Sequence, residues 1–194
     1  MSRSIVLTLI TLLNVSLLFA QSEGYDKIGK FDSGRAKVQS NGLYGIIDID
    51  GNEIVTPKYE VIQSFKDQRA KVSLNKLWGI IDWNGKEIVP VKYEKIGSFQ
   101  NRKAKVQLNE KWGIINWDGK EITTPKYDKI VNLDKGGYKI SNEGYWGLMD
   151  KDGKELIAPK YEKIKAFESN RAKVYLNGKW GVIDRNGKEI VKVN

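Results

Sequence analysis

The sequence contains neither cysteine nor histidine among its 194 residues. The missing cysteines exclude disulfide bonds and thiol nucleophiles, and the two absences together exclude the Cys/His ligand sets of zinc sites. The side chain most often used as a general base is absent as well. We therefore expect no catalytic residues, no metal site and no cofactor, and a fold held by packing and by sheet hydrogen bonds.

The first twenty residues differ in composition from the rest of the chain. Apolar stretches at 5–13 and 17–20 lead into a polar segment. This order is typical of a secretory signal peptide cut after Ala20, which leaves a single mature domain at 21–194. A membrane anchor is the alternative, but polar residues interrupt a run that would need about 20 apolar residues to span a bilayer. We expect an exported protein of the periplasm, the cell surface or the medium.

Basic residues outnumber acidic ones, with 33 Lys and Arg against 24 Asp and Glu and a net charge of +9. This charge favours anionic partners such as lipid headgroups, acidic glycans or nucleic acid. The lysines are spread evenly with acids beside them, which indicates an ordinary solvated surface instead. We expect no nucleic-acid partner, no membrane span after signal cleavage, and a monomer.

A repeat of 34 residues fills the chain after the apolar start. Tyrosines recur at this spacing, and so does a pair made of an aromatic residue and glycine. The tyrosines are Tyr25, Tyr59, Tyr93, Tyr127 and Tyr161, and the pairs are Tyr44-Gly45, Trp78-Gly79, Trp112-Gly113, Trp146-Gly147 and Trp180-Gly181. The five repeats are 25–58, 59–92, 93–126, 127–160 and 161–194.

The fifth repeat illustrates the strand pattern. Apolar and polar residues alternate at 171–176, which predicts a half-buried strand, and Asn177-Gly178 predicts a tight hairpin. A second strand is expected at 179–184, a two-residue turn at Asn186-Gly187, and a third strand at 188–191. The Tyr-acidic-x-Ile segment that opens each repeat is compatible with a short fourth strand. No stretch has the 3.6-residue apolar period of a helix.

The second strand is apolar on both faces, with Trp180 and Val182 on one and Ile183 on the other. We therefore expect each meander to stack between its neighbours. The glycine after the aromatic residue would let a ring lie against the backbone, and a proline is expected to end the third strand in three repeats. The predicted inter-repeat core comprises Tyr44, Trp78, Trp112, Trp146 and Trp180 with the glycines Gly45, Gly79, Gly113, Gly147 and Gly181.

These features predict an all-β protein of five tandem β-meander repeats. A propeller-like ring is favoured, because the first strand at 25–28 could complete the last blade and closure would remove exposed sheet edges. Propeller repeats commonly run about 40 to 50 residues, longer than the repeat here, so an open β-solenoid is the alternative.

The repeat resembles the bacterial WG-repeat (KWG) family. The motif Lys-Trp-Gly stands at 111–113 and 179–181, and the segment Ile-Ile-Asp-x-Asn-Gly-Lys-Glu-Ile stands at 80–88. The first repeat departs from the motif with Leu-Tyr-Gly at 43–45, and the fourth with Tyr-Trp-Gly at 145–147. The resemblance implies β-rich tandem repeats, often in exported or surface proteins, with no common activity and no catalytic residues to transfer.

Two recurring acidic patterns invite a chemical interpretation. The segments at 48–53 and 150–155 are similar to parts of a calcium loop, but they offer too few oxygens, and an Asp/Asn-Gly turn explains them better. The repeated glutamates could form acid–base pairs, but five equivalent copies argue against a unique site. Cross-strand ion pairs would join Glu53, Glu87, Glu121, Glu155 and Glu189 to Lys37, Lys71, Lys105, Lys139 and Lys173.

Trp83 and Trp117 occupy the same place beside a turn in the second and third repeats, where other repeats have Ile49, Lys151 and Arg185. Two such rings could form a stacking platform for a sugar or an aromatic side chain, although ordinary packing between repeats is the simpler interpretation. We therefore expect an exported, non-catalytic module that binds a protein or a glycan. The alternative is a cell-envelope module that docks on an anionic polymer through its lysines, and an enzyme is the third hypothesis.

Overall fold

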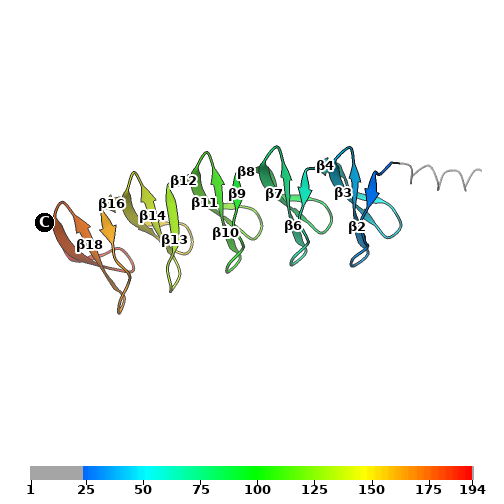
Figure 1. Ribbon diagram of the computed structural model, residues 1–194. Helices are drawn as coiled ribbons and strands as arrows, with labels where there is room; N and C mark the ends of the chain where they lie inside the picture. The colour runs from blue at the N-terminus through cyan, green and yellow to red at the C-terminus, as the bar shows by residue number, and fades with distance from the viewer. Residues whose placement is uncertain (1–23, 194) are drawn as a thin grey trace, which may run out of the picture. The chain divides into compact units, whose positions relative to one another are not determined.

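The computed structural model describes residues 24–193, which form twenty strands in five four-stranded antiparallel sheets (Figure 1). Each sheet is an up-and-down meander built from consecutive strands, which confirms an all-β fold of five tandem repeats. The predicted signal peptide lies outside the described residues. The chain divides between Val91 and Lys92 into two compact units.

Sheets 1 and 2 belong to the first compact unit, except that the last two residues of β8, Lys92 and Tyr93, belong to the second. Their strands are β1 (Lys27–Ile28), β2 (Arg35–Ser40), β3 (Leu43–Asp48) and β4 (Glu53–Tyr59), then β5 (Val61–Ile62), β6 (Arg69–Leu74), β7 (Leu77–Asp82) and β8 (Glu87–Tyr93).

Sheets 3, 4 and 5 belong to the second compact unit. Sheet 3 comprises β9 (Lys95–Ile96), β10 (Lys103–Leu108), β11 (Lys111–Asn116) and β12 (Glu121–Tyr127). Sheet 4 comprises β13 (Lys129–Asn132), β14 (Tyr138–Asn142), β15 (Tyr145–Met149) and β16 (Glu155–Tyr161). Sheet 5 comprises β17 (Lys163–Ile164), β18 (Arg171–Leu176), β19 (Lys179–Asp184) and β20 (Glu189–Val191).

The Tyr-acidic-x-Ile segment is a strand, as predicted, and it opens the sheet of its own repeat. The first of these strands, β1, pairs with β2, and the last sheet is completed by its own β17. Ring closure through an exchanged first strand is therefore not the arrangement seen. The ring itself stays a prediction.

The first hairpin of each repeat has the predicted two-residue turn. Asn41 and Gly42 have φ values of 50° and 79°, and Asn75 and Lys76 have values of 51° and 64°. Positive φ at both central residues is the signature of a type I′ turn. The acidic residue of the Tyr-acidic-x-Ile segment supports this turn, since the Asp26 carboxylate accepts a hydrogen bond from the Asn41 backbone N–H at 2.7 Å. The sequence analysis did not assign that role.

The second turn is longer than predicted. Asp184 pairs with Lys188 through a backbone hydrogen bond of 3.0 Å, so three residues form the loop, and Gly187 alone among these three has a positive φ. The Asp184 carboxylate accepts hydrogen bonds from the backbone N–H groups of Asn186 and Lys188, both at 2.9 Å. The prediction of a two-residue turn was wrong. The Asp184 carboxylate takes the place of a backbone carbonyl as hydrogen-bond acceptor, and the turn contains three residues as a result.

The last strand of the repeat does not end at its proline. β12 continues through Pro125 to Tyr127, because it is an edge strand and the missing N–H costs no ladder bond. The register also shifts beside Gly113. A Cβ on Gly113 would lie 2.6 Å from the Thr123 carbonyl oxygen and 2.7 Å from the Pro125 nitrogen. The glycine therefore makes room for the backbone of the neighbouring strand, and not for an aromatic ring as predicted.

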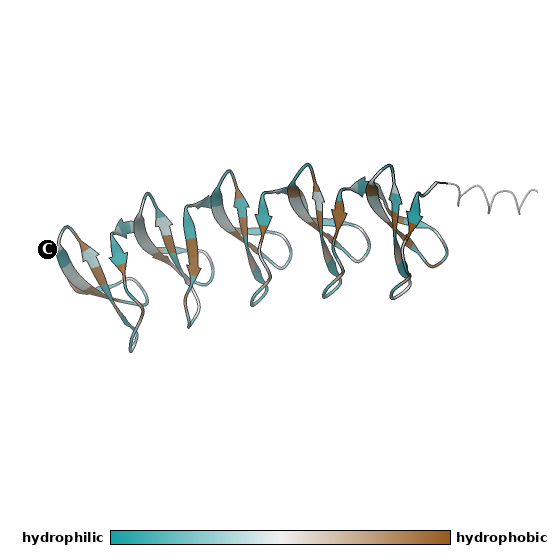
Figure 2. Ribbon diagram, in the orientation of Figure 1, coloured by the Kyte–Doolittle hydropathy of each residue, from teal (hydrophilic) through white to brown (hydrophobic). Residues whose placement is uncertain are grey.

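Within each compact unit, neighbouring sheets share a hydrophobic core, as expected for strands that are apolar on both faces. Between sheets 1 and 2 this core joins buried Ile46, Val55 and Tyr59 to Val72 and Ile81. Figure 2 shows that the hydrophobic residues lie mainly in the strands and the hydrophilic ones mainly at the turns. The largest fully buried side chains include four of the tyrosines that define the repeat, namely Tyr59, Tyr93, Tyr127 and Tyr161.

The aromatic residues before the glycines lie at the edge of this core. Tyr44, Trp112 and Trp146 are partly buried and pack against core clusters, while the side chain of Trp180 is 47% exposed. A tryptophan at this position projects from the end of the sheet near the hairpin, where the next sheet covers it only in part. The buried aromatic anchor of the repeat is thus the tyrosine.

Candidate functional site

Trp83 is packed between two sheets of the first compact unit. Its ring meets Phe65 edge-to-face at 4.9 Å, and the Arg35 guanidinium lies 4.3 Å from the ring centroid. Arg35 also donates a hydrogen bond to the Trp83 carbonyl oxygen. The tryptophan is therefore half-buried and contacted on a face and an edge, which leaves only part of the ring for a ligand.

Trp117 has the same phenylalanine neighbour in the second compact unit, but the arginine beside it belongs to its own repeat instead of the preceding one. Its ring meets Phe99 edge-to-face at 4.9 Å, and the Arg102 guanidinium lies 5.6 Å from its centroid. The loop phenylalanine thus supports the turn tryptophan in both repeats. A platform formed by Trp83 and Trp117 together stays a prediction.

A groove lies between sheets 1 and 2, beside Trp83. Its volume is about 190 Å³, and Phe65 and Trp83 form its apolar wall. Lys30, Arg35 and Lys37 line it together with one acid, so the lining carries an excess of two positive charges.

A second groove lies between sheets 3 and 4 and uses equivalent positions. Its volume is about 320 Å³. Seven lining positions are shared with the first groove at a spacing of 68 residues, or two repeats. They are Ser98, Gln100, Lys103, Ala104, Lys105, Ile114 and Asn132 in place of Lys30, Asp32, Arg35, Ala36, Lys37, Ile46 and Ser64. Two lysines and no acid line the second groove, so it also carries an excess of two positive charges.

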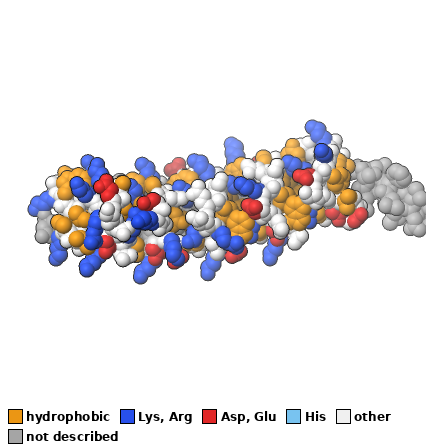
Figure 3. Space-filling model, turned by 90° about the horizontal axis from the view of Figure 1, so that it is seen from below, with side chains coloured by type: hydrophobic (Ala, Val, Ile, Leu, Met, Phe, Trp, Pro, Cys, Tyr) orange, Lys and Arg blue, Asp and Glu red, His pale blue; other side chains and the backbone are white. Residues whose placement is uncertain are grey.

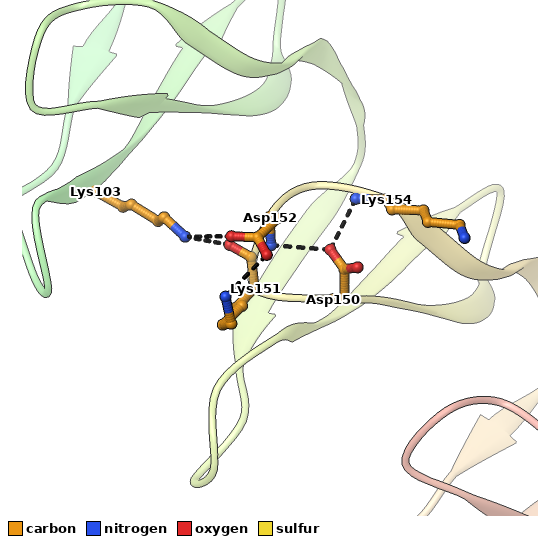
Figure 4. Close-up of polar contacts among 5 residues, drawn as sticks. All are labelled: Lys103, Asp150, Lys151, Asp152 and Lys154. Carbon is orange, nitrogen blue, oxygen red and sulfur yellow. Dashed lines mark hydrogen bonds and ion pairs between the residues drawn. The ribbon is translucent and has the colours of Figure 1, made fainter.

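Lys103 crosses from sheet 3 to the turn between β15 and β16 (Figure 4). Its ammonium donates to the Lys151 carbonyl oxygen and lies 3.7 Å from an Asp152 carboxylate oxygen. Asp152 also accepts from Lys151 at 2.8 Å, and this hydrogen bond is the main reason why the pKa of Asp152 is lowered. Lys103 is therefore held at the rim of the groove, and the nearby Asp152 carboxylate neutralises part of its charge.

Lys105 lies two residues further along β10 and binds a neutral partner. Its ammonium donates to the Ile130 carbonyl oxygen of β13 at 3.2 Å. The same contact recurs between Lys37 and Ile62 at 3.3 Å and between Lys139 and Ile164 at 3.4 Å. This lysine series therefore bridges neighbouring sheets through a carbonyl.

The repeated glutamates pair with a different set of residues than predicted. Glu121 accepts from the Tyr93 hydroxyl at 2.7 Å and from Lys92 at 3.0 Å. The prediction of cross-strand pairs with lysines such as Lys105 was wrong, because those lysines turn toward the next sheet. The Tyr93 hydrogen bond is the first cause, and Lys92 a further cause, of a lowered Glu121 pKa. The same glutamate position thus joins consecutive repeats.

The aspartates of the suggested calcium segments hold turns. The Asp48 carboxylate accepts backbone N–H groups of Asp50 at 3.0 Å and Asn52 at 2.8 Å, and its pKa is lowered, chiefly by a side-chain hydrogen bond from Asn52. Asp150 makes the equivalent bonds, one of which reaches the Lys154 backbone (Figure 4). Residues 24–193 contain no group of three or more acidic side chains placed to hold a metal ion.

The chain belongs to the WG-repeat family. The family model described as "WG containing repeat" matches residues 24–44, 44–78, 78–112, 112–144, 146–180 and 180–193. Its four central matches begin and end at or next to the aromatic residue before a glycine, so the family motif is in phase with the repeat derived from the sequence. No curated protein matches the chain.

Several solved structures have a limited likeness to this chain. Kluyveromyces lactis Hsv2p is 14% identical, over 85% of this chain and 63% of that one, with a TM-score of 0.35. PorZ, a bacterial surface component of the type-IX secretion system of Porphyromonas gingivalis, is 13% identical over 88% and 26%, with a TM-score of 0.36. The extracellular domain of BT4673 from B. thetaiotaomicron is 11% identical over 86% and 28%, with a TM-score of 0.35. The chain thus spans less than two thirds of each of these proteins. The TM-scores are too low to support a conclusion about function.

In the described part of the chain, no helix has the length and the apolar composition needed to cross a membrane.

Proposed function

We propose that this chain is an exported, non-catalytic module that binds an acidic glycan. The observation that carries the proposal is the pair of grooves between sheets, which use equivalent residues and each carry an excess of two positive charges. An aromatic side chain lines each groove, Trp83 in the first and Tyr138 in the second. Lysine, hydroxyl and amide groups around an aromatic ring suit a hydroxylated ligand that also carries negative charge.

A glycan fits these grooves better than a folded protein does. A stable protein interface usually buries about 1,200 Å² or more, whereas each groove here is a small concave space. A polymer of similar sugar units could place one unit in each of several grooves, and such multivalent contact would raise the overall affinity. A protein ligand is the remaining alternative from the sequence analysis.

The absence of catalysis is part of the proposal and is supported by the repeated glutamates. Glu87 accepts from Tyr59 at 2.8 Å and from Lys58 at 3.3 Å, and Glu121 has the same two kinds of partner. A catalytic carboxyl group must be able to reach the substrate, and it works with a second carboxyl group in a different environment. These glutamates are instead bound by a tyrosine and a lysine, and both copies have the same surroundings.

Binding to immobilised or soluble polysaccharides tests the proposal. We expect the mature protein to bind polymers that contain uronic acids or sulfate and to bind their neutral counterparts at least about tenfold more weakly, a difference of about 1.4 kcal/mol. Affinity electrophoresis followed by calorimetry would measure both. Equal binding to acidic and neutral polymers, or no binding to either, would contradict it.

Docking on any anionic polymer through dispersed lysines is the second candidate. Figure 3 shows Lys and Arg side chains scattered over the visible face, with acidic side chains among them. Lys58, Lys92, Lys126 and Lys160 each pair with a glutamate at 2.7–3.3 Å, which neutralises one lysine of most repeats. Dispersed docking predicts a steep loss of affinity with salt and indifference to the sugar, whereas the groove hypothesis predicts a preference among polymers at fixed salt.

Export can be tested separately by N-terminal sequencing of the protein from its native envelope or medium. We expect the mature chain to begin near Gln21 because Ala20 ends the predicted signal peptide. Retention of Met1 would contradict this.

A further inference from the structure

The groove between sheets 3 and 4 differs from its counterpart through three substitutions in the fourth repeat. Tyr138 stands where the other repeats have alanine, Leu133 where they have phenylalanine, and Lys151 where the second and third repeats have tryptophan. The alanines are Ala36, Ala70, Ala104 and Ala172, and the phenylalanines are Phe31, Phe65, Phe99 and Phe167. The fourth repeat therefore replaces the pair of rings seen at Phe65 and Trp83 with a single tyrosine at another position.

The substitutions change the volume as well as the lining. The groove beside Phe65 and Trp83 has a volume of about 190 Å³, and the groove beside Tyr138 has about 320 Å³. The larger volume falls within the usual range of small-molecule sites, about 300–1,000 Å³, and equals the space of about ten water molecules. This is the scale of one sugar unit.

The second groove has an apolar floor and polar walls. Ile114 and Ala104 are buried at its base, and the half-buried Tyr138 stands at one side, where it packs against the core between sheets 3 and 4. Gln100 and Asn132 face each other across the rim, joined by a hydrogen bond of 3.0 Å. A ring wall, amides at the rim and two ammonium groups thus surround one space.

The two lysines are not equivalent as ligands for an anion. Lys103 lies 3.7 Å from the Asp152 carboxylate, which offsets part of its charge. Lys105 donates instead to a neutral carbonyl oxygen at 3.2 Å. Tyr138 is held in its protonated form, because burial and the nearby Asp152 raise its pKa, so its hydroxyl can donate a hydrogen bond.

We propose that this cavity binds one carboxylated sugar unit, a hexuronate, within an acidic polysaccharide. The sugar ring lies against Tyr138, its carboxylate pairs with Lys105 and more weakly with Lys103, and its hydroxyl groups bind the rim amides of Gln100 and Asn132. A neutral sugar would leave the Lys105 charge without a partner, and a bare anion would leave the tyrosine face unused. The inference rests on the proposed function and assigns its principal site.

The ligands that test it are oligogalacturonate, the same oligomer as its methyl ester, and poly-glutamate of matched charge. The methyl ester keeps the sugar and removes the charge, whereas poly-glutamate keeps carboxylates and removes the sugar. Calorimetry on the mature protein should show binding of oligogalacturonate at least about tenfold tighter than of either control, since a charge-assisted contact and a ring contact are each expected to contribute about 1–3 kcal/mol.

The variants Tyr138→Ala and Lys105→Gln should each weaken oligogalacturonate binding about tenfold. Tyr138→Ala restores the residue found in the other four repeats, so the fold should tolerate it, and thermal unfolding would verify this. Lys139→Gln is the matched control, because Lys139 makes the same kind of carbonyl contact, to Ile164 at 3.4 Å, and lines neither groove. We expect it to change affinity less than about threefold, which is under 1 kcal/mol.

The outcomes separate this inference from the function on which it rests. Binding of oligogalacturonate that survives Tyr138→Ala and Lys105→Gln unchanged would place the glycan elsewhere and overturn the inference alone. Equal affinity for the methyl ester or for poly-glutamate would overturn the hexuronate assignment. Absence of binding to any acidic polysaccharide would overturn both the inference and the proposed function.

Discussion

The hydroxyls of Tyr93 and Tyr127 allow one hydrogen bond to be tested against a matched control. Both side chains are 1% exposed and occupy the same position of the repeat in the second compact unit. Tyr93 donates to Glu121 at 2.7 Å, whereas the buried Tyr127 hydroxyl makes no hydrogen bond of normal geometry, although Lys126 and Glu155 lie near enough to influence its pKa. In the latter repeat Lys126 binds the equivalent carboxylate, Glu155, at 2.7 Å.

Replacement of each tyrosine by phenylalanine should therefore have opposite effects. A hydrogen bond to a charged group contributes about 1.5–3 kcal/mol, and the low end applies to Tyr93→Phe because hydrogen bonding to water can compensate at a partly exposed carboxylate. Glu121 is such a group, since its side chain is 27% exposed and it keeps Lys92 at 3.0 Å. Tyr127→Phe removes a buried hydroxyl that makes no hydrogen bond of normal geometry, so it should be neutral or should stabilise the fold by up to about 1 kcal/mol.

Urea unfolding followed by circular dichroism would measure both free energies of unfolding, with the slope of each transition used to verify that the unfolded states are comparable. The two changes lie in one compact unit, so they report on the same transition. We expect the free energies of unfolding of the two variants to differ by about 1.5 kcal/mol or more. Equal losses for Tyr93→Phe and Tyr127→Phe would refute the view that the hydroxyl hydrogen bond stabilises the contact between repeats.

Three further predictions concern the glycine, the tryptophans and the effect of acid. Gly113→Ala should destabilise the fold by about 1–3 kcal/mol, measured in urea, because the new Cβ would lie 2.6 Å from the Thr123 carbonyl; a neutral effect would contradict the close strand approach. Trp112→Ala should cost about 2–3 kcal/mol and Trp180→Ala, at a 47% exposed side chain, about 1 kcal/mol or less; equal costs would instead favour a closed ring. The pKa of Glu121 is lowered in the folded state. The contribution of Glu121 to stability is therefore present above about pH 4.3 and is lost as the pH falls below that value. Glu121→Gln should flatten the dependence of the melting temperature on pH between about pH 5 and 3.

Local patterns in the sequence were sufficient to predict the repeat, the strands and the first hairpin. A two-residue turn depends on the φ preferences of adjacent residues, and Asn41 and Gly42 satisfy them. The alternation of apolar and polar residues likewise fixes which side chains of a strand share a face. The turn in the segment that follows Asp48 was predicted from its Asp-Gly pair for the same reason, and the Asp48 carboxylate accepts backbone N–H groups within it.

The tertiary structure decided what depends on residues far apart in the chain. Tyr93 and Trp112 are both repeated aromatic residues, but the next sheet covers the tyrosine completely and the tryptophan only in part. The partner of Glu121 is Tyr93, 28 residues earlier, and the partner of Lys105 is a carbonyl 25 residues later. Preferences of neighbouring residues cannot predict either contact, because each depends on how one sheet packs against the next.

The candidate site illustrates the same division. The departure of Tyr138 from the alanine of the other repeats is visible in the sequence, but its meaning is not, since a lone tyrosine on a strand can equally well face solvent or the core. The packing of sheet 4 against sheet 3 places Tyr138 beside Lys105 and leaves a space of about 320 Å³ between them. The sequence alone determined the repeat and its strands through interactions between near neighbours, and the tertiary structure determined the groove, because a cavity exists only where two separately formed sheets meet.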